Sequence, residues 1–225
     1  MDKELVMKYA PYIYFDKNEP FFPVRVGCTI FETPGYSASF RRNIDFDPQQ
    51  VRFVIEYAVY WHFDIGHLYD LEHVWVFVAP DGSIDDCEAS FHGDYLKGLL
   101  KDRSNIEDST HVRLYSQPGK HAFSPIAEVF ELLPGFRADT GENAGEGGLL
   151  VTGVARGRYE TNEEIDDMVR KYLKNYSFVP TLEYCKYVIP DEIVTSWDIL
   201  DKEIPEMIRQ KLEEIRIWAD NQEKE

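Results

Sequence analysis

Two apolar stretches in the first half of the chain limit the folds that it can adopt. Residues 52–63 read RFVIEYAVYWHF and residues 72–79 read EHVWVFVA, and both are rich in β-branched and aromatic side chains. Such residues favour strands, and a strand that is apolar on both faces lies in a sheet that is covered on both sides. The sequence therefore predicts a layered, β-rich body.

The second apolar stretch continues into a predicted hairpin. The run PDGS at 80–83 is typical of a turn, and the chain then returns as a strand, so 72–92 is predicted to form a β-hairpin. Two registers are possible. With a five-residue loop His92 stands beside Asp70, whereas with a four-residue loop one residue of slip turns His92 to the opposite face.

Helical periodicity is predicted only later in the chain. Three segments place apolar residues at helical spacing: 126–133, 165–173 and from about Pro205 onwards. Thr161 and Glu164 form a capping box before the second of these. The first 60 residues contain several prolines and are expected to be extended. Residues 177–190 are expected to be irregular.

These patterns predict one α+β domain over residues 1–225, with an antiparallel β-sandwich body and helices mainly in the C-terminal half. The β-rich body, with a candidate metal site, is expected at 8–125 and the helix-containing part at 126–220.

The charge of the chain excludes several classes of partner. The chain has 24 Lys and Arg against 41 Asp and Glu, a net charge of −17, so binding to nucleic acid is not expected. No run approaches the ~20 apolar residues of a membrane span. The N-terminus lacks the apolar segment of a signal peptide, and three cysteines without CxxC spacing predict neither a zinc ribbon nor a disulfide framework, so a cytoplasmic location is expected.

A cluster of metal-binding residue types lies between the two apolar stretches. Residues 61–73, WHFDIGHLYDLEH, contain three histidines together with Asp64, Asp70 and Glu72. If the chain is extended here, Asp70 and Glu72 share one face, and Gly66 permits a turn that brings His67 to it. Carboxylate and imidazole donors bind Mg, Ca, Mn or Zn, so the cluster predicts a divalent-metal site. The alternative is a solvated strand start with alternating charges.

Two other features have simpler interpretations. His73 alternates away from Glu72 and is expected to be hydrogen-bonded in the core. The loop DTGENAGEGG at 139–148 lacks the Gly-Lys-Ser/Thr ending of a phosphate-binding loop and carries acidic residues that repel phosphate. It is expected to be a lid or a plain loop.

The segment from Gly66 to Glu72, GHLYDLE, resembles the Gly-His-x-x-Asp-x-Glu heptapeptide of the necrosis-inducing (Nep1-like) proteins, and Ser90-Phe91-His92-Gly93 is similar to a Ser/Ala-His-Gly segment that follows it in that family. Tyr69 and Leu71 depart from the family motif, which has His and Trp there. The secretion signal and disulfide cysteines expected of those toxins are also missing.

A second and broader resemblance is to the fungal vacuolar-protein-sorting-type (Vps sixty-two-like) domain. It rests on three segments in the same order: Tyr9-Ala10-Pro11-Tyr12, Asp70 to Val74, and Gly119 to Phe123. Together the two resemblances cover roughly residues 8–125.

The first resemblance implies a β-sandwich pocket in which His67, Asp70 and Glu72, with Asp64 as the upstream carboxylate, bind a divalent metal ion. His92 and His121 would line this pocket as a ligand or catalytic base. We therefore expect a divalent-metal-binding domain of unknown substrate. A cation held in this way lowers the pKa of bound water, which is the common route to hydrolysis, so a metal-dependent hydrolase is one expectation. The alternative is a non-catalytic module that binds a carbohydrate or a polar lipid headgroup, so the expected partner is a small molecule or a headgroup.

Overall fold

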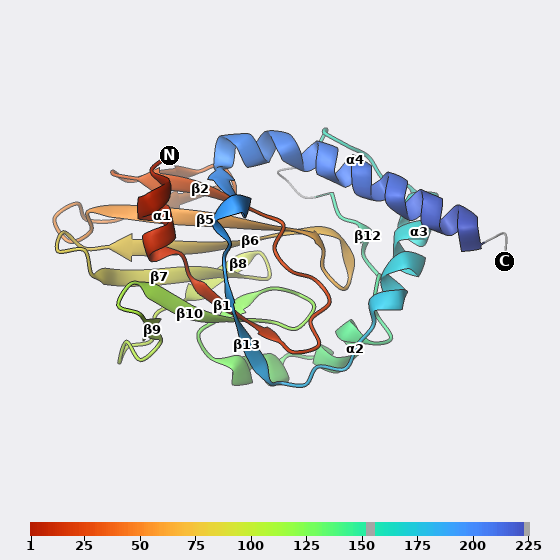
Figure 1. Ribbon diagram of the computed structural model, residues 1–225, viewed down its shortest axis with the longest axis horizontal. Coiled ribbons are helices and arrows are strands. Elements are labelled where there is room, and N and C mark those ends of the chain that lie inside the picture. The colour runs from red at the N-terminus through yellow and green to blue at the C-terminus, as the bar shows by residue number, and fades with distance from the viewer. Residues whose placement is uncertain (152–155, 223–225) are drawn as a thin grey trace.

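The computed structural model describes residues 1–151 and 156–222 (Figure 1). Within them the larger of two main sheets has seven strands. In order across that sheet they are β14 (Val194–Ser196), β2 (Arg25–Phe31), β5 (Phe53–Phe63), β6 (His67–Val78), β7 (Ile84–Phe91) and β8 (Asp94–Lys97), with β12 (Gly148–Leu149) beside β6. The apolar stretch at 52–63 is thus a central strand, as predicted.

The smaller main sheet covers one face of the larger one. Its strands are β11 (Phe123–Ser124), β10 (His111–Ser116), β1 (Tyr12–Asp16) and β13 (Tyr184–Val188), with β9 (Ile106–Glu107) paired to β10. A separate hairpin consists of β3 (Gly35–Ser37) and β4 (Arg42–Ile44). The helices are α1 (Lys3–Tyr9), α2 (Phe136–Thr140), α3 (Glu163–Leu173) and α4 (Trp197–Gln222), with 3₁₀ turns at Ala127–Leu132, Lys174–Tyr176 and Asp191–Ile193.

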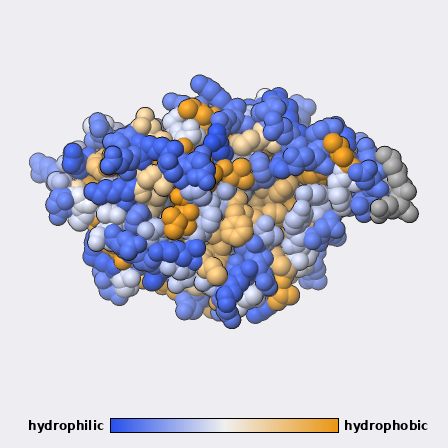
Figure 2. Space-filling model, viewed as in Figure 1, coloured by the Kyte–Doolittle hydropathy of each residue, from blue (hydrophilic) through white to orange (hydrophobic). Residues whose placement is uncertain are grey.

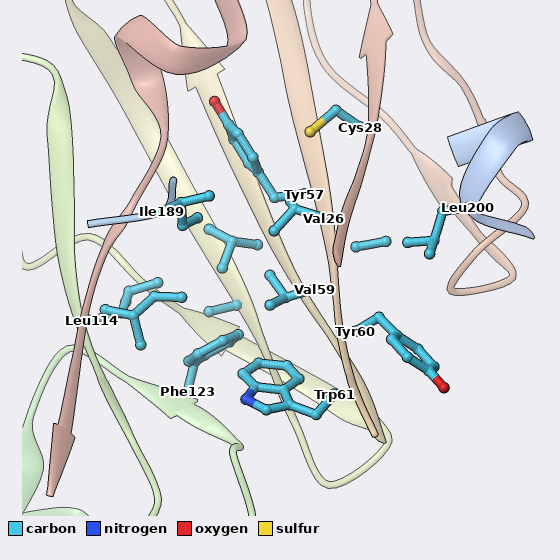
Figure 3. Close-up of a cluster of buried hydrophobic side chains, with 14 of the residues drawn as sticks. Val26, Cys28, Tyr57, Val59, Tyr60, Trp61, Leu114, Phe123, Ile189 and Leu200 are labelled. Atoms are coloured by element: carbon cyan, nitrogen blue, oxygen red, sulfur yellow. The ribbon is translucent and has the colours of Figure 1, made fainter. Parts of the chain in front are cut away.

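The main core fills the space between the two sheets. Figure 3 shows Leu114 of β10 and Phe123 of β11 facing Val59 and Trp61 of β5, and all four side chains are fully buried. Apolar residues on the inner faces of two stacked sheets are what holds a sandwich together. The predicted α+β class with a β-sandwich body is confirmed.

The sheets are mixed, whereas an antiparallel body was expected. The consecutive strands β5, β6, β7 and β8 are antiparallel. The pairs β1–β10, β14–β2 and β12–β6 are parallel. Two parallel strands need a long connection, and each of these pairs joins segments that are far apart in the chain. The periodicity of the sequence does not reveal which distant segments pair.

The predicted hairpin contains both of the registers considered for it. Val78 lies opposite Ile84, as a five-residue loop requires, but a bulge between Phe77 and Val78 then shifts the pairing so that Val74 lies opposite Ala89. Because one residue of slip reverses a face, the rest of the hairpin follows the other register. His92 lies in the turn between β7 and β8, with φ at 53°.

The helices differ from the prediction at their N-termini. Residues 3–9 form α1 although an extended segment was expected, because Asp2 caps the helix by accepting a hydrogen bond from Leu5 N at 3.0 Å. The cap of α3 is Asn162, which accepts from Ile165 N at 2.9 Å, while Thr161 donates to Asp166. The predicted capping box is therefore wrong by one residue.

Two C-terminal segments were also predicted incorrectly. The last helix begins at Trp197, so Pro205 lies inside it. Proline cannot donate to the carbonyl four residues earlier, and here Arg158 Nη1 donates to the carbonyl oxygen of Asp201 at 2.9 Å instead. Residues 184–188, expected to be irregular, form β13 at the edge of the smaller sheet.

The segment at 126–133 forms a short 3₁₀ helix, Ala127–Leu132, in place of the expected α-helix. None of the helices in the described ranges is both long enough and apolar enough to cross a membrane.

Candidate functional site

The connection between β5 and β6 positions the first two predicted ligands. Asp64 Oδ1 accepts hydrogen bonds from the backbone N–H groups of Gly66 at 2.5 Å and His67 at 2.6 Å, which closes a tight turn. The turn folds His67 back over Asp64, so that His67 Nε2 lies 3.2 Å from Asp64 Oδ2. The predicted turn at Gly66 does bring these two side chains together.

Asp70 and Glu72 follow on β6 and are both largely buried. Side chains alternate along a strand, so these two share the face that carries Val74. Asp70 Oδ2 lies 3.0 Å from Nδ1 of His121, and Glu72 accepts a hydrogen bond from the hydroxyl of Ser90. The two carboxylates therefore lie near each other but have different partners.

His121 is held between two carboxylates. Its Nδ1 contacts Asp70, its Nε2 lies 3.4 Å from Glu19 Oε1, and its ring stacks on Trp61 with centroids 4.4 Å apart. Burial alone would lower the pKa of His121, but the two carboxylates outweigh it and raise the pKa to about 10. The ring is therefore an imidazolium at neutral pH.

This charge state bears on the predicted role of His121 as a general base. A base needs a ring nitrogen with a free lone pair, and both nitrogens of an imidazolium carry protons. His121 is also fully buried. The arrangement favours a structural cation that balances Asp70 and Glu19.

Asp64 has cationic partners as well. Lys120 Nζ lies 3.2 Å from Asp64 Oδ2. Burial raises the pKa of Asp64, but the positive charges of His67 and Lys120 outweigh this and hold the pKa below its ordinary value. Asp64 is therefore ionised and paired.

Glu72 differs from the other carboxylates. Burial and the negative charge of Asp70 raise the pKa of Glu72 to about 8, and the hydrogen bond from Ser90 only partly opposes this. Within the described parts of the chain no lysine, arginine or histidine forms an ion pair with Glu72. The cluster thus contains one buried carboxyl group that has no direct cationic partner and is largely protonated at neutral pH.

The chemistry of these donors fits a hard divalent cation, because three carboxyl groups and one imidazole are available and Glu72 has no cationic partner of its own. Their present arrangement pairs them with Lys120, His121 and Ser90. Within residues 1–151 and 156–222, no three His, Cys, Asp or Glu side chains converge on one point as metal ligands would. Metal binding by Asp64, His67, Asp70 and Glu72 stays a prediction.

His92 is not brought to the carboxylates. Its Nε2 lies 2.8 Å from Oε1 of Gln117, and it sits in the β7–β8 turn that the pair Phe91–Asp94 closes. Its catalytic role stays a prediction.

His73 is buried in the core as predicted, stacked on Trp75 with centroids 5.5 Å apart. Neither of its ring nitrogens has a hydrogen-bond partner within the described chain, so the expected hydrogen bond of this histidine is wrong. Its contacts are aromatic instead, with Phe40 at a centroid distance of 5.0 Å.

Several residues of the cluster were not predicted from the sequence, namely Glu19, Trp61, Ser90, Gln117 and Lys120. Trp61 and Ser90 lie in the segments that carried the motifs. Glu19 and Gln117 reach the cluster through tertiary contacts, and no local pattern marks them.

A cleft of about 350 Å³ opens beside the turn at Gly66. Besides His67 and Lys120, the cleft is lined by Asp139 at the end of α2 and by Asn143 and Glu146 of the glycine-rich loop. The backbone of this glycine-rich loop is tied to the turn, since Gly145 N donates to the carbonyl of Ile65 and Gly147 N to that of Gly66, both at 2.8 Å. The loop expected to be a lid or a plain connection is thus a wall of the cleft.

No protein-family model and no curated protein matches the chain. Solved structures to which it is similar include NLPPya, a necrosis-inducing Nep1-like protein, in complex with glucosamine and in complex with mannosamine. Each is 18% identical, with a TM-score of 0.37, and the match covers 54% of this chain and 64% of that chain. The match therefore spans less than two thirds of NLPPya. The broader resemblance to vacuolar-protein-sorting-type domains stays a prediction.

Proposed function

We propose that this chain is a non-catalytic module that binds a hydroxyl-rich polar ligand, a carbohydrate or a polar headgroup, in the cleft beside His67. The observation that carries the proposal is the composition of the cleft, which combines carboxylate, amide, imidazole and ammonium groups around one opening. A ligand with many hydroxyl groups needs donors and acceptors in close proximity. The volume of about 350 Å³ falls in the range of about 300–1,000 Å³ typical of small-molecule sites.

The signs of charge in the cleft favour a ligand that also carries an amine. Asp139 at the end of α2 and Glu146 on the loop can accept hydrogen bonds from an ammonium group, while Lys120 is already paired with Asp64. Asn143 offers both a donor and an acceptor for hydroxyl groups. An amino sugar can form hydrogen bonds with all three of these side chains.

The positions of the two histidines that were predicted to be catalytic favour binding over hydrolysis. Neither His92 nor His121 lines the cleft. A general base must lie within hydrogen-bonding reach of the group it deprotonates, and His121 is buried between Asp70 and Glu19.

A divalent cation at Asp64, His67, Asp70 and Glu72 is a separate part of the proposal. Its support is the buried carboxyl group of Glu72, which lies beside Asp70 without a cationic partner and would ionise when a cation binds. A bound cation would supply the missing positive charge and a Lewis acid next to the cleft. Asp64 would then bind the cation and also hold the turn at Gly66, which lines the cleft.

The test is titration calorimetry of the full chain with glucosamine, with glucose and with choline as probes. We expect glucosamine to bind more tightly than glucose, and Asp139→Asn and Glu146→Gln each to weaken it about tenfold, as for loss of a charge-assisted hydrogen bond worth ~1.4 kcal/mol. The control is Asp220→Asn on the exposed end of α4. Absence of binding by all three probes, or equal affinities for the loop variants and the control, would contradict the proposal.

A further inference from the structure

A second cavity, of about 280 Å³, opens between the segment that precedes β2, the end of β5, and helices α3 and α4. Figure 2 shows apolar residues gathered near the centre of the viewed face, beneath α4. None of the residues that line this cavity lines the cleft beside His67. It is therefore a separate opening, and the proposed function does not use it.

Aromatic side chains form the walls of this cavity. Phe21 packs against Phe63 with ring centroids 5.4 Å apart and against Tyr176 at 5.1 Å, and Phe63 packs against Tyr172 at 5.5 Å. Phe22, with 49% of its surface exposed, lies at the mouth. Rings packed in this way form a preorganised apolar surface, against which a further aromatic ring can pack at the usual centroid distance of about 4.5–7 Å.

Two polar groups, His62 and Lys211, interrupt the aromatic lining. His62 makes no hydrogen bond to any described residue. Its Nδ1 is buried, so Nε2 is the ring nitrogen that a ligand in the cavity reaches. A ligand that hydrogen-bonds to Nε2 would give the imidazole a partner.

Lys211 is the cation of the cavity. Its ammonium group lies 2.5 Å from Oε2 of Glu214, which is 59% exposed, whereas the lysine side chain is 23% exposed. Because Glu214 is exposed to solvent, its attraction to Lys211 is screened and contributes only about 0–1 kcal/mol, so an anionic ligand can replace Glu214 as the partner.

We propose that this cavity binds a small aromatic carboxylate, with its ring against Phe21, Phe22 and Phe63 and its carboxylate at Lys211 and His62. A quaternary ammonium ligand would also suit aromatic walls, but the ammonium of Lys211 repels it. The volume lies just below the usual range for small-molecule sites, which limits the ligand to one ring or a fused pair.

The experiment is a titration of the full chain, followed by nuclear magnetic resonance, with phenylacetate and indole-3-acetate and with their neutral amides. We expect the acids to perturb signals of α3, α4 and the segment before β2, and to bind at least tenfold more tightly than the amides. Lys211→Gln should abolish this preference for the acid, and Phe22→Ser should weaken acid and amide alike. Lys202→Gln, an exposed lysine on the same helix, is the matched control.

Three results would overturn the proposal: no saturable binding at millimolar concentration, equal affinity for acid and amide, or an unchanged preference in Lys211→Gln. Thermal unfolding of each variant shows whether it is folded. The Glu146→Gln variant of the other cleft should bind the aromatic acids like the unmodified chain, so failure of one site is distinguishable from failure of the other.

Discussion

Glu19 accepts a hydrogen bond from the backbone N–H of Gly119, 100 residues later in the chain, at 2.7 Å. This bond joins the segment before β2 to the loop before β11 and fixes the Glu19 carboxylate beside His121. The backbone of Gly119 has a φ of 71°, and an added Cβ would lie 2.8 Å from Ile65, so only glycine fits there. The position of His121 between two carboxylates therefore depends on a contact between distant parts of the sequence.

We predict that Glu19→Gln destabilises the fold by about 3 kcal/mol, because it leaves a buried imidazolium with one carboxylate partner where it had two. The raised pKa of His121 contributes stability that is fully present below the pKa of about 6.5 of the unfolded chain and is lost as the pH rises through about 10. In Glu19→Gln the loss should begin at the same pH, which the unfolded chain sets, but should be smaller and end at a lower pH. Urea unfolding at pH 6, 8 and 9.5 measures both effects.

The matched control for this prediction is Glu183→Gln, at an exposed ion pair with Lys17. Exposed pairs contribute little, so its free energy of unfolding should change by less than about 1 kcal/mol. Equal effects of the two substitutions would show that burial of the carboxylate between Gly119 and His121 has no special role.

A second prediction concerns the proline inside α4. Arg158 donates to the carbonyl of Asp201, the group that Pro205 leaves without its helical partner. Arg158→Ala should therefore cost about 1–2 kcal/mol in the natural chain. In a Pro205→Ala background the helix itself supplies the donor, so the same substitution should cost less. A double-mutant cycle by urea unfolding measures the coupling, and additive effects would contradict the assignment.

The parts of the fold that could be predicted from the sequence are those with strong local patterns. Residues 52–63 are apolar on both faces and form the central strand β5, and the turn at 80–83 closes the predicted hairpin. Alternation along β6 placed Asp70 and Glu72 on one face. Gly66 marked the turn that folds His67 over Asp64.

The remaining features depend on interactions that a local pattern does not show. The bulge between Phe77 and Val78 changes the register of the hairpin, and His92 lies in the turn between β7 and β8, not on a strand face. The cap at Asn162 displaced the expected capping box because Thr161 bonds to Asp166 instead. Glu19 enters the candidate site only through its contact with Gly119, and the loop residues of the cleft only through the pairing of β12 with β6.

A third prediction follows from the environment of His62. Its pKa is lowered to about 4 in the fold against about 6.5 when unfolded, so the unfolded chain takes up the proton first as the pH falls. The stability that His62 contributes is therefore present above pH 6.5 and is lost between 6.5 and 4. Between pH 7 and pH 5 the free energy of unfolding of His62→Phe should fall by about 1 kcal/mol less than that of the natural chain. This figure allows for the partial exposure of the ring, which reduces the effect. Urea unfolding at the two pH values measures the difference, and an equal fall in both proteins would contradict the prediction.

The last prediction tests the metal ion. If Asp64, His67, Asp70 and Glu72 bind a divalent cation, Mg, Ca, Mn or Zn at 100 times its Kd should stabilise the chelator-stripped chain by about 2.7 kcal/mol. The effect should disappear in Asp70→Ala and in Glu72→Ala, and remain in Asp220→Asn at the exposed end of α4. Burial and the charge of Asp70 raise the pKa of Glu72, and a cation that binds beside it opposes both effects. Metal binding should accordingly weaken as the pH falls below about 8, where protons compete for Glu72. A stabilisation that is independent of pH, or equal in all three variants, would place the cation elsewhere on this acidic chain. If none of the four metals stabilises the chain, Lys120 and His121 are the cations that balance the cluster.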